Sequence, residues 1–473
     1  MEASSRPRRS STQEPDGTCD GADRISALPD ELLLDVLARL PCAGAAARTR
    51  VLSRRWSGLW ASLRQIVFRH VPFPSLEEAL GRVPPPPPAV SLLEILVPRR
   101  GFPNPNEDSA RVNSLLRAAA RLAPVKLVFR LPAFLIGRYR LAVHLPRLDS
   151  ATSIALEIPS PFSLHVPAGT EFPALETLSL SHGMVDFDTL LSCCSRLRTL
   201  HLSALFGNPD IRIHSPTLQE LVVRCKSRMT QRVDIVAPML KELTMSITSE
   251  EVSISVLAPM VQKVSWLCCY LGASIVFGLW SLNKLQLQSA EGQGELSSLR
   301  IYACPNPSFA RDEADNFTQE IEKQMVAPFS VLELHLTTKG HAFGAFVIHL
   351  LGMDRVRCGT QRLKVILRKS AVKGGCPPLC PCEFRNWKSQ IICLTALEEL
   401  EFNGLEGGDH EFDLLKLILR CAPVLKRIIL KLSEKASASN DGRAKIYNNF
   451  KACSSVECDV YDSSGECMFG MHY

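Results

Sequence analysis

The sequence predicts a multidomain protein in which a small all-α module of three helices precedes a β-rich α/β solenoid of short repeats and a C-terminal cap. Three observations lead to this prediction. The chain has 473 residues, which exceeds the size of an ordinary single domain. Apolar residues recur at helical spacing near the N-terminus, and a six-residue leucine pattern recurs at nearly constant spacing from position 175.

Composition indicates a globular protein without a general affinity for nucleic acid. Hydrophobic residues make up 46% of the chain, and 54 Lys and Arg nearly balance 48 Asp and Glu. The N-terminal segment, assigned over residues 1–22 to a disordered basic tail, lacks the apolar core of a secretory signal. We therefore expect a cytoplasmic or nuclear protein, or both, whose 17 scattered cysteines are mostly reduced and hold no metal or cofactor.

Residues 23–64 predict three short helices. Pro29 suits the first turn of the first helix, and Pro41 ends it. Residues 43–48 can form a second helix. A third helix places three apolar side chains on one face: Trp56, Leu59 and Trp60.

This module should expose apolar surface, because about forty residues cannot bury it all. A partner or a neighbouring domain is therefore expected to cover it. No Asp or Glu occurs between Pro41 and Leu76, whereas six arginines do: Arg48, Arg50, Arg54, Arg55, Arg64 and Arg69. The partner surface is expected to be acidic, and the alternative is a solvated basic face.

The same segment resembles an F-box in its plant form, over residues 23–68. The resemblance rests on DRISALPDELLLDVLARLP and on AARTRVLSRRWSGLW. It implies that the module binds the Skp-type adaptor of a cullin-based ubiquitin ligase. The residues that the resemblance assigns to adaptor binding are Leu28, Pro29, Leu32, Val36, Leu40, Val51, Leu52, Trp56 and Trp60.

Residues 69–110 contain a run of five prolines and a second cluster of Pro and Asn around a short apolar strand. We predict a linker with a Pro-rich insertion that acts as an extended spacer. An SH3-type ligand is the alternative.

A repeat array is assigned to residues 111–370. Its L-x-x-L-x-L pattern occurs in LETLSL (175–180), LRTLHL (197–202), LQELVV (218–223), LKELTM (240–245), VQKVSW (261–266) and LNKLQL (282–287). Spacings of 21 or 22 residues are typical of leucine-rich repeats. Looser copies occur in SIALEI (153–158), VLELHL (331–336), LEELEF (397–402) and LKRIIL (425–430).

A second short segment lies between successive units of this array. It alternates and ends in proline, in IRIHSP (211–216), VDIVAP (233–238) and SISVLAP (253–259). Each coil is therefore predicted to contain two strands and no helix. The Asn or Cys position of the standard repeat is missing, which makes these irregular leucine-rich repeats of the kind that follow plant F-boxes.

Polar residues beside the inward leucines are predicted to form a column on the concave face. Its members are Thr177, Ser179, Thr199, His201, Glu220, Val222, Glu242, Thr244, Lys263, Ser265, Lys284 and Gln286. Most of them fit a solvated polar face equally well. The candidate target-binding residues are His201, Glu220, Glu242 and Lys263.

Residues 264–283 carry no charge and are long enough to span a bilayer. Their glycine, serine and asparagine content lowers the mean hydropathy, and the repeat register passes through them. We interpret them as part of the array, with a membrane helix as the alternative.

The C-terminal region predicts a strand, a helix over 412–421 that ends before Pro423, and a second strand. The segment LEELEFNGLEGGDHEFDLLKLILRCAPVLKRIIL resembles the FBD domain of plant F-box proteins, which we assign to residues 371–440, with 441–473 as a tail. The same region contains Cys376, Cys380 and Cys382, whose spacing does not fit a zinc knuckle. We expect a reduced loop there, and a metal site is the alternative.

Common signatures of hydrolases, metalloproteases and nucleotide-binding enzymes are absent from the sequence. The residues and the resemblance together predict a non-enzymatic substrate-recognition subunit of an SCF-type ubiquitin ligase. The F-box would bind the adaptor and, through it, a cullin, and the solenoid would bind a target protein, with no nucleic acid or membrane as partner. The alternative is a non-catalytic interaction scaffold that uses the F-box fold outside a ligase.

Overall fold

The structure is a computed structural model in which two compact units, residues 1–63 and 64–473, divide the chain. The residues that it describes are 25, 28–69, 71–83, 90–98, 105–132, 141–205, 207–225, 227–250, 252–272, 275–292, 294–305, 314–368, 387–438, 444, 448 and 456–471.

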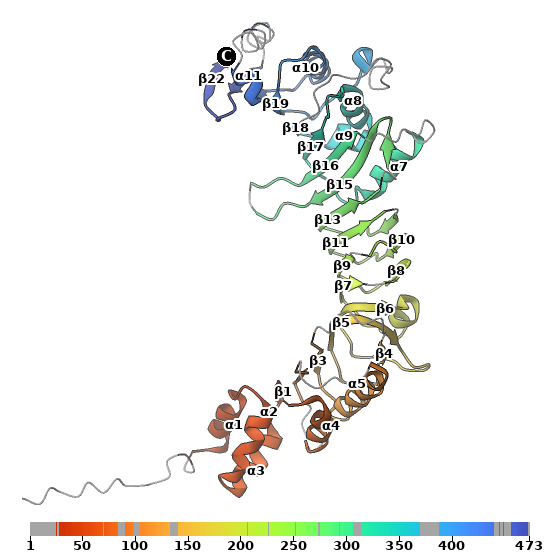
Figure 1. The fold of residues 1–473 in the computed structure, drawn as a ribbon, viewed down its shortest axis with the longest axis vertical. Helices are drawn as coiled ribbons and strands as arrows, with labels where there is room; N and C mark the ends of the chain where they lie inside the picture. The colour runs from red at the N-terminus through yellow and green to blue at the C-terminus, as the bar shows by residue number, and fades with distance from the viewer. Residues whose placement is uncertain are drawn as a thin grey trace, which may run out of the picture. The chain divides into compact units, whose positions relative to one another are not determined.

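The first unit is a three-helix module, red to orange in Figure 1. Its helices are α1 (Asp30–Ala38), α2 (Ala43–Arg48) and α3 (Arg54–Leu59), with 3-10 turns η1 (Thr49–Val51) and η2 (Trp60–Ser62). The three predicted helices are confirmed. Its core consists of Leu33, Leu37, Ala46, Trp56, Leu59 and Leu63.

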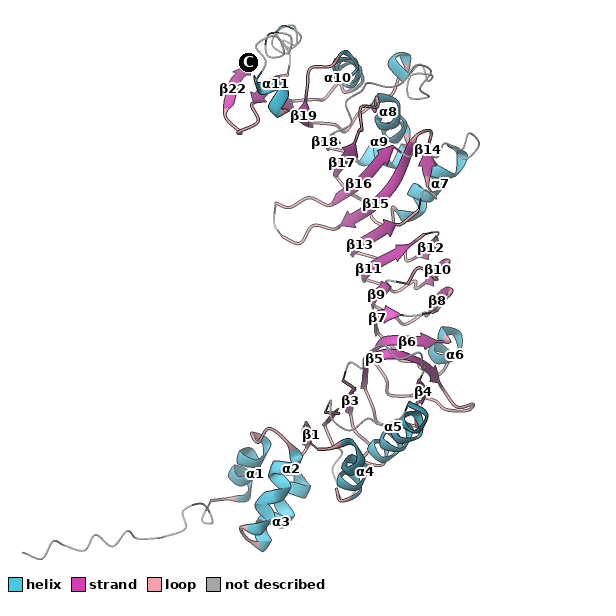
Figure 2. Cartoon of the chain, in the orientation of Figure 1, coloured by secondary structure: helices cyan, strands magenta, loops and turns pink. Residues whose placement is uncertain are grey.

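The second unit is β-rich, and 19 of its described strands join one sheet (Figure 2). In the first half these are β1 (Gln65–Phe68), β2 (Leu92–Leu96), β3 (Lys126–Arg130), β4 (Leu141–His144), β5 (Ser153–His165), β6 (Thr177–Val185), β7 (Thr199–Leu205), β9 (Glu220–Cys225) and β11 (Glu242–Ser249). In the second half they are β13 (Lys263–Tyr270), β14 (Val276–Phe277), β15 (Trp280–Gln288), β16 (Ser298–Pro305), β17 (Val331–Thr337), β18 (Arg362–Arg368), β19 (Glu399–Leu405), β20 (Arg427–Leu432), β21 (Glu457–Tyr461) and β22 (Cys467–Met471).

Helices and one small sheet accompany the large sheet. The helices are α4 (Phe73–Gly81), α5 (Pro105–Ala120), α6 (Phe187–Ser192), α7 (Ala314–Gln324), α8 (Gly344–Gly352), α9 (Asp354–Gly359), α10 (Asp409–Cys421), α11 (Glu434–Ala438) and the 3-10 turn η3 (Trp387–Ser389). The small sheet contains β8 (Asp210–His214), β10 (Arg232–Val236) and β12 (Ser253–Leu257).

Five of the six predicted repeat units stack as parallel neighbours, β6, β7, β9, β11 and β13. Their register places the first outward residue of each unit in one row, from Thr177 to Lys263. Inward side chains such as Leu200 and Leu243 are buried, because successive residues of a strand face opposite sides of the sheet. The predicted second element is also confirmed: β8, β10 and β12 pair in parallel, as return strands of successive coils.

The sixth unit departs from the prediction. Strand β15 runs antiparallel to both β13 and β16, so the register does not continue through residues 264–283. The chain turns back at Gly278, which has a φ of +57°, and β14 and β15 form a hairpin in place of a return strand. Leucine spacing indicates which face of a strand is buried. It does not indicate strand direction, because a parallel and an antiparallel strand have the same spacing.

The uncharged stretch forms β13, β14 and the start of β15. Among the described residues, no helix is long and apolar enough to cross a membrane.

Beyond β16 the strands are parallel again, from β16 through β21. The looser repeat copies lie in β5, β17, β19 and β20, as expected. The predicted strand, helix and strand near the C-terminus are β19, α10 and β20.

Gly404 allows a bulge in β19, because its φ is +85° and a Cβ there would lie 2.7 Å from the carbonyl oxygen of Leu367.

Two predicted boundaries need correction. Residues 69–110 are not a linker in their described part, since they contain α4 and β2, and β2 pairs with β1 and β3. Residues 441–473 are not only a tail, since β21 extends the sheet beside β20. In both regions a short strand with alternating apolar residues joins the sheet. Turn-forming residues around each strand dominate the sequence pattern, and they led to the prediction of a linker and a tail. The five-proline run lies outside the described residues.

Candidate adaptor-docking and target-binding surfaces

Besides Ile25, which precedes the first helix, four large apolar residues of the three-helix module are exposed, and we name these four the exposed apolar set: Leu32, Val36, Val51 and Leu52. Leu32 and Val36 lie one turn apart on α1, and each keeps 48% of its surface exposed. Val51 and Leu52 are 83% and 64% exposed. Because Leu33 and Leu37 fill the core from the other side of α1, folding of the module does not require this set.

The other predicted adaptor-binding residues divide by burial. Pro29 is exposed, and Leu28, Leu40 and Trp60 are partly buried against the core. Trp56 is only 5% exposed and belongs to the core of the module, and its assignment to adaptor binding stays a prediction. The helical pattern of α3 identifies its apolar face but not which side chains on it point inward. Leu33, a core residue missed from the sequence, could have been found from its spacing to Leu37.

The predicted basic surface is confirmed only in part. Arg55 pairs with Asp30, with 2.7 Å between Nε and Oδ1. Arg69 belongs to the second unit, where it pairs with Glu94 at 3.3 Å. The remaining arginines are exposed and form no ion pair among the described residues: Arg48, Arg50, Arg54 and Arg64.

The predicted column exists on β6, β7, β9, β11 and β13. Thr199, Glu220, Glu242 and Lys263 occupy consecutive positions of one row. In the next row, His201 lies opposite Val222. Lys284 and Gln286 also lie on this face but in other rows, because the reversed β15 pairs them with Cys269 and Leu267.

The structure brings the four candidate target-binding residues together as one hydrogen-bonded pair and one ion pair. His201 Nε2 lies 3.0 Å from Glu220 Oε1, and Lys263 Nζ lies 3.7 Å from Glu242 Oε2. All four side chains are between 40% and 58% exposed. Hydroxyl side chains lie beside them in both rows, so this part of the sheet offers short polar groups, an accessible His–Glu hydrogen bond and an accessible Lys–Glu ion pair to a partner.

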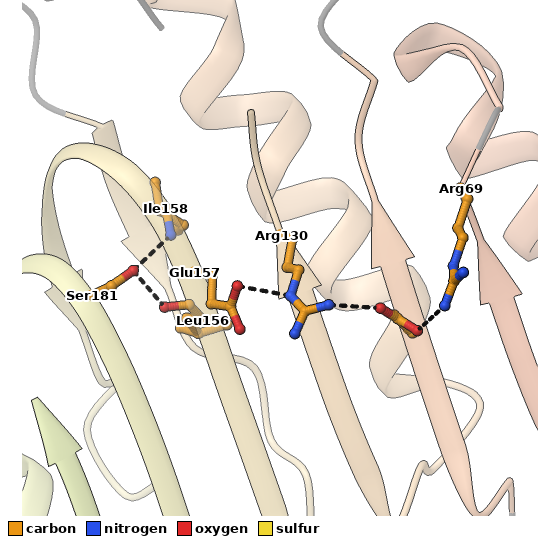
Figure 3. A network of polar contacts seen from close by, with 7 residues as sticks. Arg69, Arg130, Leu156, Glu157, Ile158 and Ser181 are labelled. Atoms are coloured by element: carbon orange, nitrogen blue, oxygen red, sulfur yellow. Dashed lines mark hydrogen bonds and ion pairs between the residues drawn. The ribbon is translucent and has the colours of Figure 1, made fainter. Parts of the chain in front are cut away.

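A charge network that sequence analysis missed lies on the preceding strands (Figure 3). Arg130 on β3 donates from Nε to Glu157 at 2.7 Å and from Nη1 to Glu94 at 2.9 Å, and Arg69 also reaches Glu94. The hydrogen bond to Glu157 raises the pKa of Arg130 further above its ordinary value. Charged residues of opposite sign at outward positions of consecutive strands were the available signal.

A second network lies on the strands after the hairpin. Arg300 Nε lies 3.1 Å from Glu333 Oε2, and His335 Nε2 lies 3.3 Å from the same atom. The hydrogen bond from His335, followed by the charges of Arg300 and Lys364, holds the pKa of Glu333 below its ordinary value against the opposing effect of burial. The His335 ring also stacks on Tyr302, with 4.2 Å between ring centroids.

In the loop before α10, one buried carboxylate organises the backbone. Glu411 is fully buried, and its Oε2 accepts hydrogen bonds from the backbone N–H groups of Glu406 at 3.0 Å, Gly407 at 2.8 Å and Gly408 at 2.9 Å. The carboxylate also lies at the positive end of the helix. The GLEGGDHE segment thus has a structural role that the sequence did not reveal.

The buried cysteines do not resemble catalytic thiols. Burial raises the pKa of Cys194 and that of Cys268 to about 12, so neither is a thiolate near neutral pH. Within the described part of the chain, no group of three or more potential ligands could hold a metal ion. Cys376, Cys380 and Cys382 lie outside the described residues.

Comparison with known proteins identifies two regions. The F-box domain matches residues 25–68, and the leucine-rich repeats of the FBD-associated F-box protein At5g56370 match residues 112–269. An FBD-associated F-box protein of Arabidopsis thaliana, At5g56560, is 30% identical over 220 residues, which cover 42% of this chain and 48% of that protein.

Two further Arabidopsis proteins give the same result. The FBD-associated F-box protein At5g50270 is 26% identical over 43% of this chain and 51% of its own length. The F-box/FBD/LRR-repeat protein At2g04230 is 54% identical over 46 residues, 10% of each chain. The chain thus spans about half the length of the two longest-matching relatives. Together with the helical module and the stacked repeats, these matches show that the chain contains an F-box domain and FBD-associated leucine-rich repeats, and that it is similar to F-box/FBD/LRR-repeat proteins of Arabidopsis thaliana.

Proposed function

We propose that this chain is the substrate-recognition subunit of a cullin-based, SCF-type ubiquitin ligase. F-box domains generally bind Skp-type adaptors. The observation that carries the proposal is the exposed apolar set, which lies on a module whose core is already complete without it. Such a surface is costly to leave in water and is typical of a binding site.

The adaptor would cover Leu32, Val36, Val51 and Leu52. Apolar side chains near the centre of an interface each contribute about 2 kcal/mol or more when fully buried. The four arginines of the segment that form no ion pair among the described residues would favour an acidic adaptor surface and increase the association rate more than the affinity. A cullin would join through the adaptor.

We propose further that the second unit is one continuous solenoid closed by an FBD cap. Parallel pairing occurs on both sides of the antiparallel stretch from β13 to β16, which supports a single array with one insertion. The FBD segment would contain β19, α10 and β20, and the β21–β22 pair that follows would end the sheet beside β20. The other domain boundaries given above stay predictions.

The target protein would bind the face that carries His201, Glu220, Glu242 and Lys263. Proteins that combine an F-box with leucine-rich repeats are generally non-catalytic adaptors, so this chain would make no bond itself. It would raise the effective concentration of a target lysine near the charged ubiquitin carrier. The proposed location is the cytoplasm, the nucleus or both.

Reconstitution tests this function. The full-length chain, co-expressed with a plant Skp-type adaptor and a cullin, is expected to purify as a stable complex. A chain that binds the adaptor but never enters a complex with the cullin would support the scaffold alternative. Failure to bind the adaptor at all would contradict both the docking surface and the ligase role.

A further inference from the structure

The outward face of the second half of the large sheet is rich in cations. Strands β15 to β18 are neighbours in the sheet, and their outward side chains include five cations but one carboxylate, Glu333. Strand β20 adds two more cations on the same face. We name the outward cations of these strands the cationic surface: Lys284, Arg300, Arg362, Lys364, Arg368, Arg427 and Lys431.

The ion pairs of this surface leave the cations more accessible than the carboxylates. Five pairs between neighbouring strands have N···O distances of 2.7 to 3.4 Å. The paired cations are 31% to 55% exposed, whereas their carboxylate partners are 5% to 28% exposed. The potential that reaches a binding partner is therefore positive. The shielded carboxylates are Glu333, Glu399, Glu401 and Asp459.

The strands before the antiparallel stretch do not share this asymmetry. Glu220 and Glu242 are 41% and 54% exposed, close to the 40% of His201 and the 58% of Lys263. Carboxylates there are as accessible as the groups that they pair with. The excess of accessible positive charge thus belongs to β15–β20 and not to the sheet as a whole.

Two members of the cationic surface, Lys284 and Arg368, form no ion pair among the described residues. The Lys284 ammonium lies 4.6 Å from the ring centroid of Tyr302, and that ring stacks on His335. An aromatic ring orients an ammonium group without neutralising its charge. Lys284 is therefore held in place and remains available to an anion.

A shared carboxylate leaves further charge uncompensated. Glu401 accepts from both Lys364 and Lys431, whose Nζ atoms lie 3.2 Å and 2.8 Å from its oxygens, so two ammonium groups face one anion. The cations extend over the five strand spacings from β15 to β20, or roughly 24 Å. About seven residues of extended chain span that length.

We propose that the cationic surface binds an acidic segment of the target protein, about seven residues long, whose carboxylates contact the accessible cations from β15 to β20. This inference rests on the proposed function, in which the repeat array binds the target, and it adds the charge of the segment that is recognised. Complementary charge would speed association and would exclude basic segments.

Peptide binding to the full-length chain, without adaptor or cullin, tests the inference. The probe is a fluorescein-labelled peptide of about seven Asp and Glu residues, and the reference is its Asn and Gln counterpart. Fluorescence anisotropy at low salt is expected to show at least about tenfold tighter binding of the acidic peptide. The difference should shrink as salt increases, because salt screens exposed charges.

Charge-reversal variants locate the site. Lys284→Glu with Arg368→Glu should weaken the acidic peptide at least about tenfold. Because neither cation has an ion pair among the described residues, the melting temperature should change little. The control is Arg198→Glu with Lys241→Glu, at two exposed cations outside the cationic surface that also form no ion pair within the described part of the chain. It changes the net charge equally and should weaken the peptide less than about twofold.

A drop in melting temperature would call for the milder Lys284→Gln with Arg368→Gln variant, for which the same order of affinities is expected. Equal binding of the acidic and amide peptides, or equal losses in the two charge-reversal variants, would overturn the inference. Tighter binding of a short oligouridine, lost in Lys284→Glu with Arg368→Glu, would assign the surface to RNA instead. Adaptor binding should be unchanged in every variant, so a failure here is distinguishable from a failure of the ligase role.

Discussion

Arg55 joins the third helix of the F-box to the start of the first by pairing with Asp30. Its Nε lies 2.7 Å from Asp30 Oδ1, and its Nη2 donates to the carbonyl oxygen of Leu28 at 2.6 Å. Both charged side chains are partly exposed, at 37% and 57%, so the ion pair contributes only about 0 to 1 kcal/mol to folding. Its main effect is to hold the segment that enters α1, where Leu28 and Pro29 lie.

The Arg55→Ala variant should therefore affect binding more than folding. We expect adaptor affinity to fall about three- to tenfold, because the entering segment is no longer held in place. The melting temperature of the full-length chain should change little. Isothermal titration calorimetry with the adaptor checks the first expectation. Arg54→Ala, an exposed neighbour without an ion pair among the described residues, is the control, and equal losses in both variants would contradict the positional role.

Replacement of Leu32 and Val36 together by alanine should remove a central part of the adaptor interface. Affinity is expected to fall at least about a hundredfold, which corresponds to roughly 3 kcal/mol. Both side chains are half exposed in the free chain, so the helices should remain folded. Pull-down and calorimetry with the adaptor measure the loss, and undiminished binding would refute the docking surface.

The Trp56→Ala variant should lose stability, unlike the Leu32 and Val36 double variant, which should lose adaptor binding while it stays folded. Removal of this core side chain should destabilise the module by about 3 to 5 kcal/mol and thereby abolish binding indirectly. Hydrogen exchange of α1 and α3 in the full-length chain distinguishes the two cases, because only Trp56→Ala should increase it.

The sequence was most informative where local pattern and burial coincide. Proline and apolar spacing identified the helices of the F-box, and the leucine spacing identified five stacked strands. The reversal at β15 was missed because periodicity is blind to strand direction, and Gly278 alone does not distinguish a hairpin from a coil.

Site residues were predicted less well, for a related reason. Helical spacing shows which side of α3 is apolar. How deeply the Trp56 side chain is buried depends instead on how α3 packs against α1. Ion pairs between strands also cannot be predicted from a single repeat. Arg130 pairs with Glu94, 36 residues earlier, and with Glu157, 27 residues later, only because the sheet register brings these side chains together. Glu411 was missed because its partners are backbone N–H groups, which leave no side-chain signature.

The Glu411→Ala variant tests the role of that carboxylate. Three backbone donors would lose a charged acceptor, so we expect the loop and α10 to be destabilised by about 2 to 4 kcal/mol. Hydrogen exchange over residues 405–415 should increase, whereas the F-box should not change. Glu411→Gln keeps an oxygen acceptor and should show a smaller effect. Equal effects of the two variants would mean that charge, and not hydrogen bonding alone, holds the loop.

Acid should destabilise the strands around Glu333. The folded state holds the pKa of this carboxyl group below its ordinary value, chiefly through the hydrogen bond from His335. The group therefore stabilises the fold above its unfolded pKa, about 4.3, and this contribution is lost as the pH falls through the lower folded value. Thermal unfolding should show a decline in stability below about pH 4.5 that is smaller in Glu333→Gln. An unchanged decline in the variant would assign the acid sensitivity to other carboxylates, such as Glu401.

The proposed target surface is tested by replacing His201, Glu220, Glu242 and Lys263 together with alanine. The four side chains form two pairs, so joint replacement removes each side chain with its partner and leaves no single member of a pair behind. All are at least 40% exposed, and the loss of stability should stay near 1 kcal/mol. Adaptor binding should be retained while target ubiquitination is lost, as measured after affinity purification with the proteasome inhibited.

The control lies on the inward side of the same strands. Leu200→Ala and Leu243→Ala should each destabilise the array by about 2 to 5 kcal/mol, because they open cavities in the stacked core. Selective loss of target ubiquitination in the fourfold variant, with melting behaviour unlike that of the leucine variants, would identify this face as a recognition surface. Normal ubiquitination by the fourfold variant would instead place target recognition elsewhere, in the loops between the repeats or in the C-terminal segment, because adaptor binding alone cannot select a target.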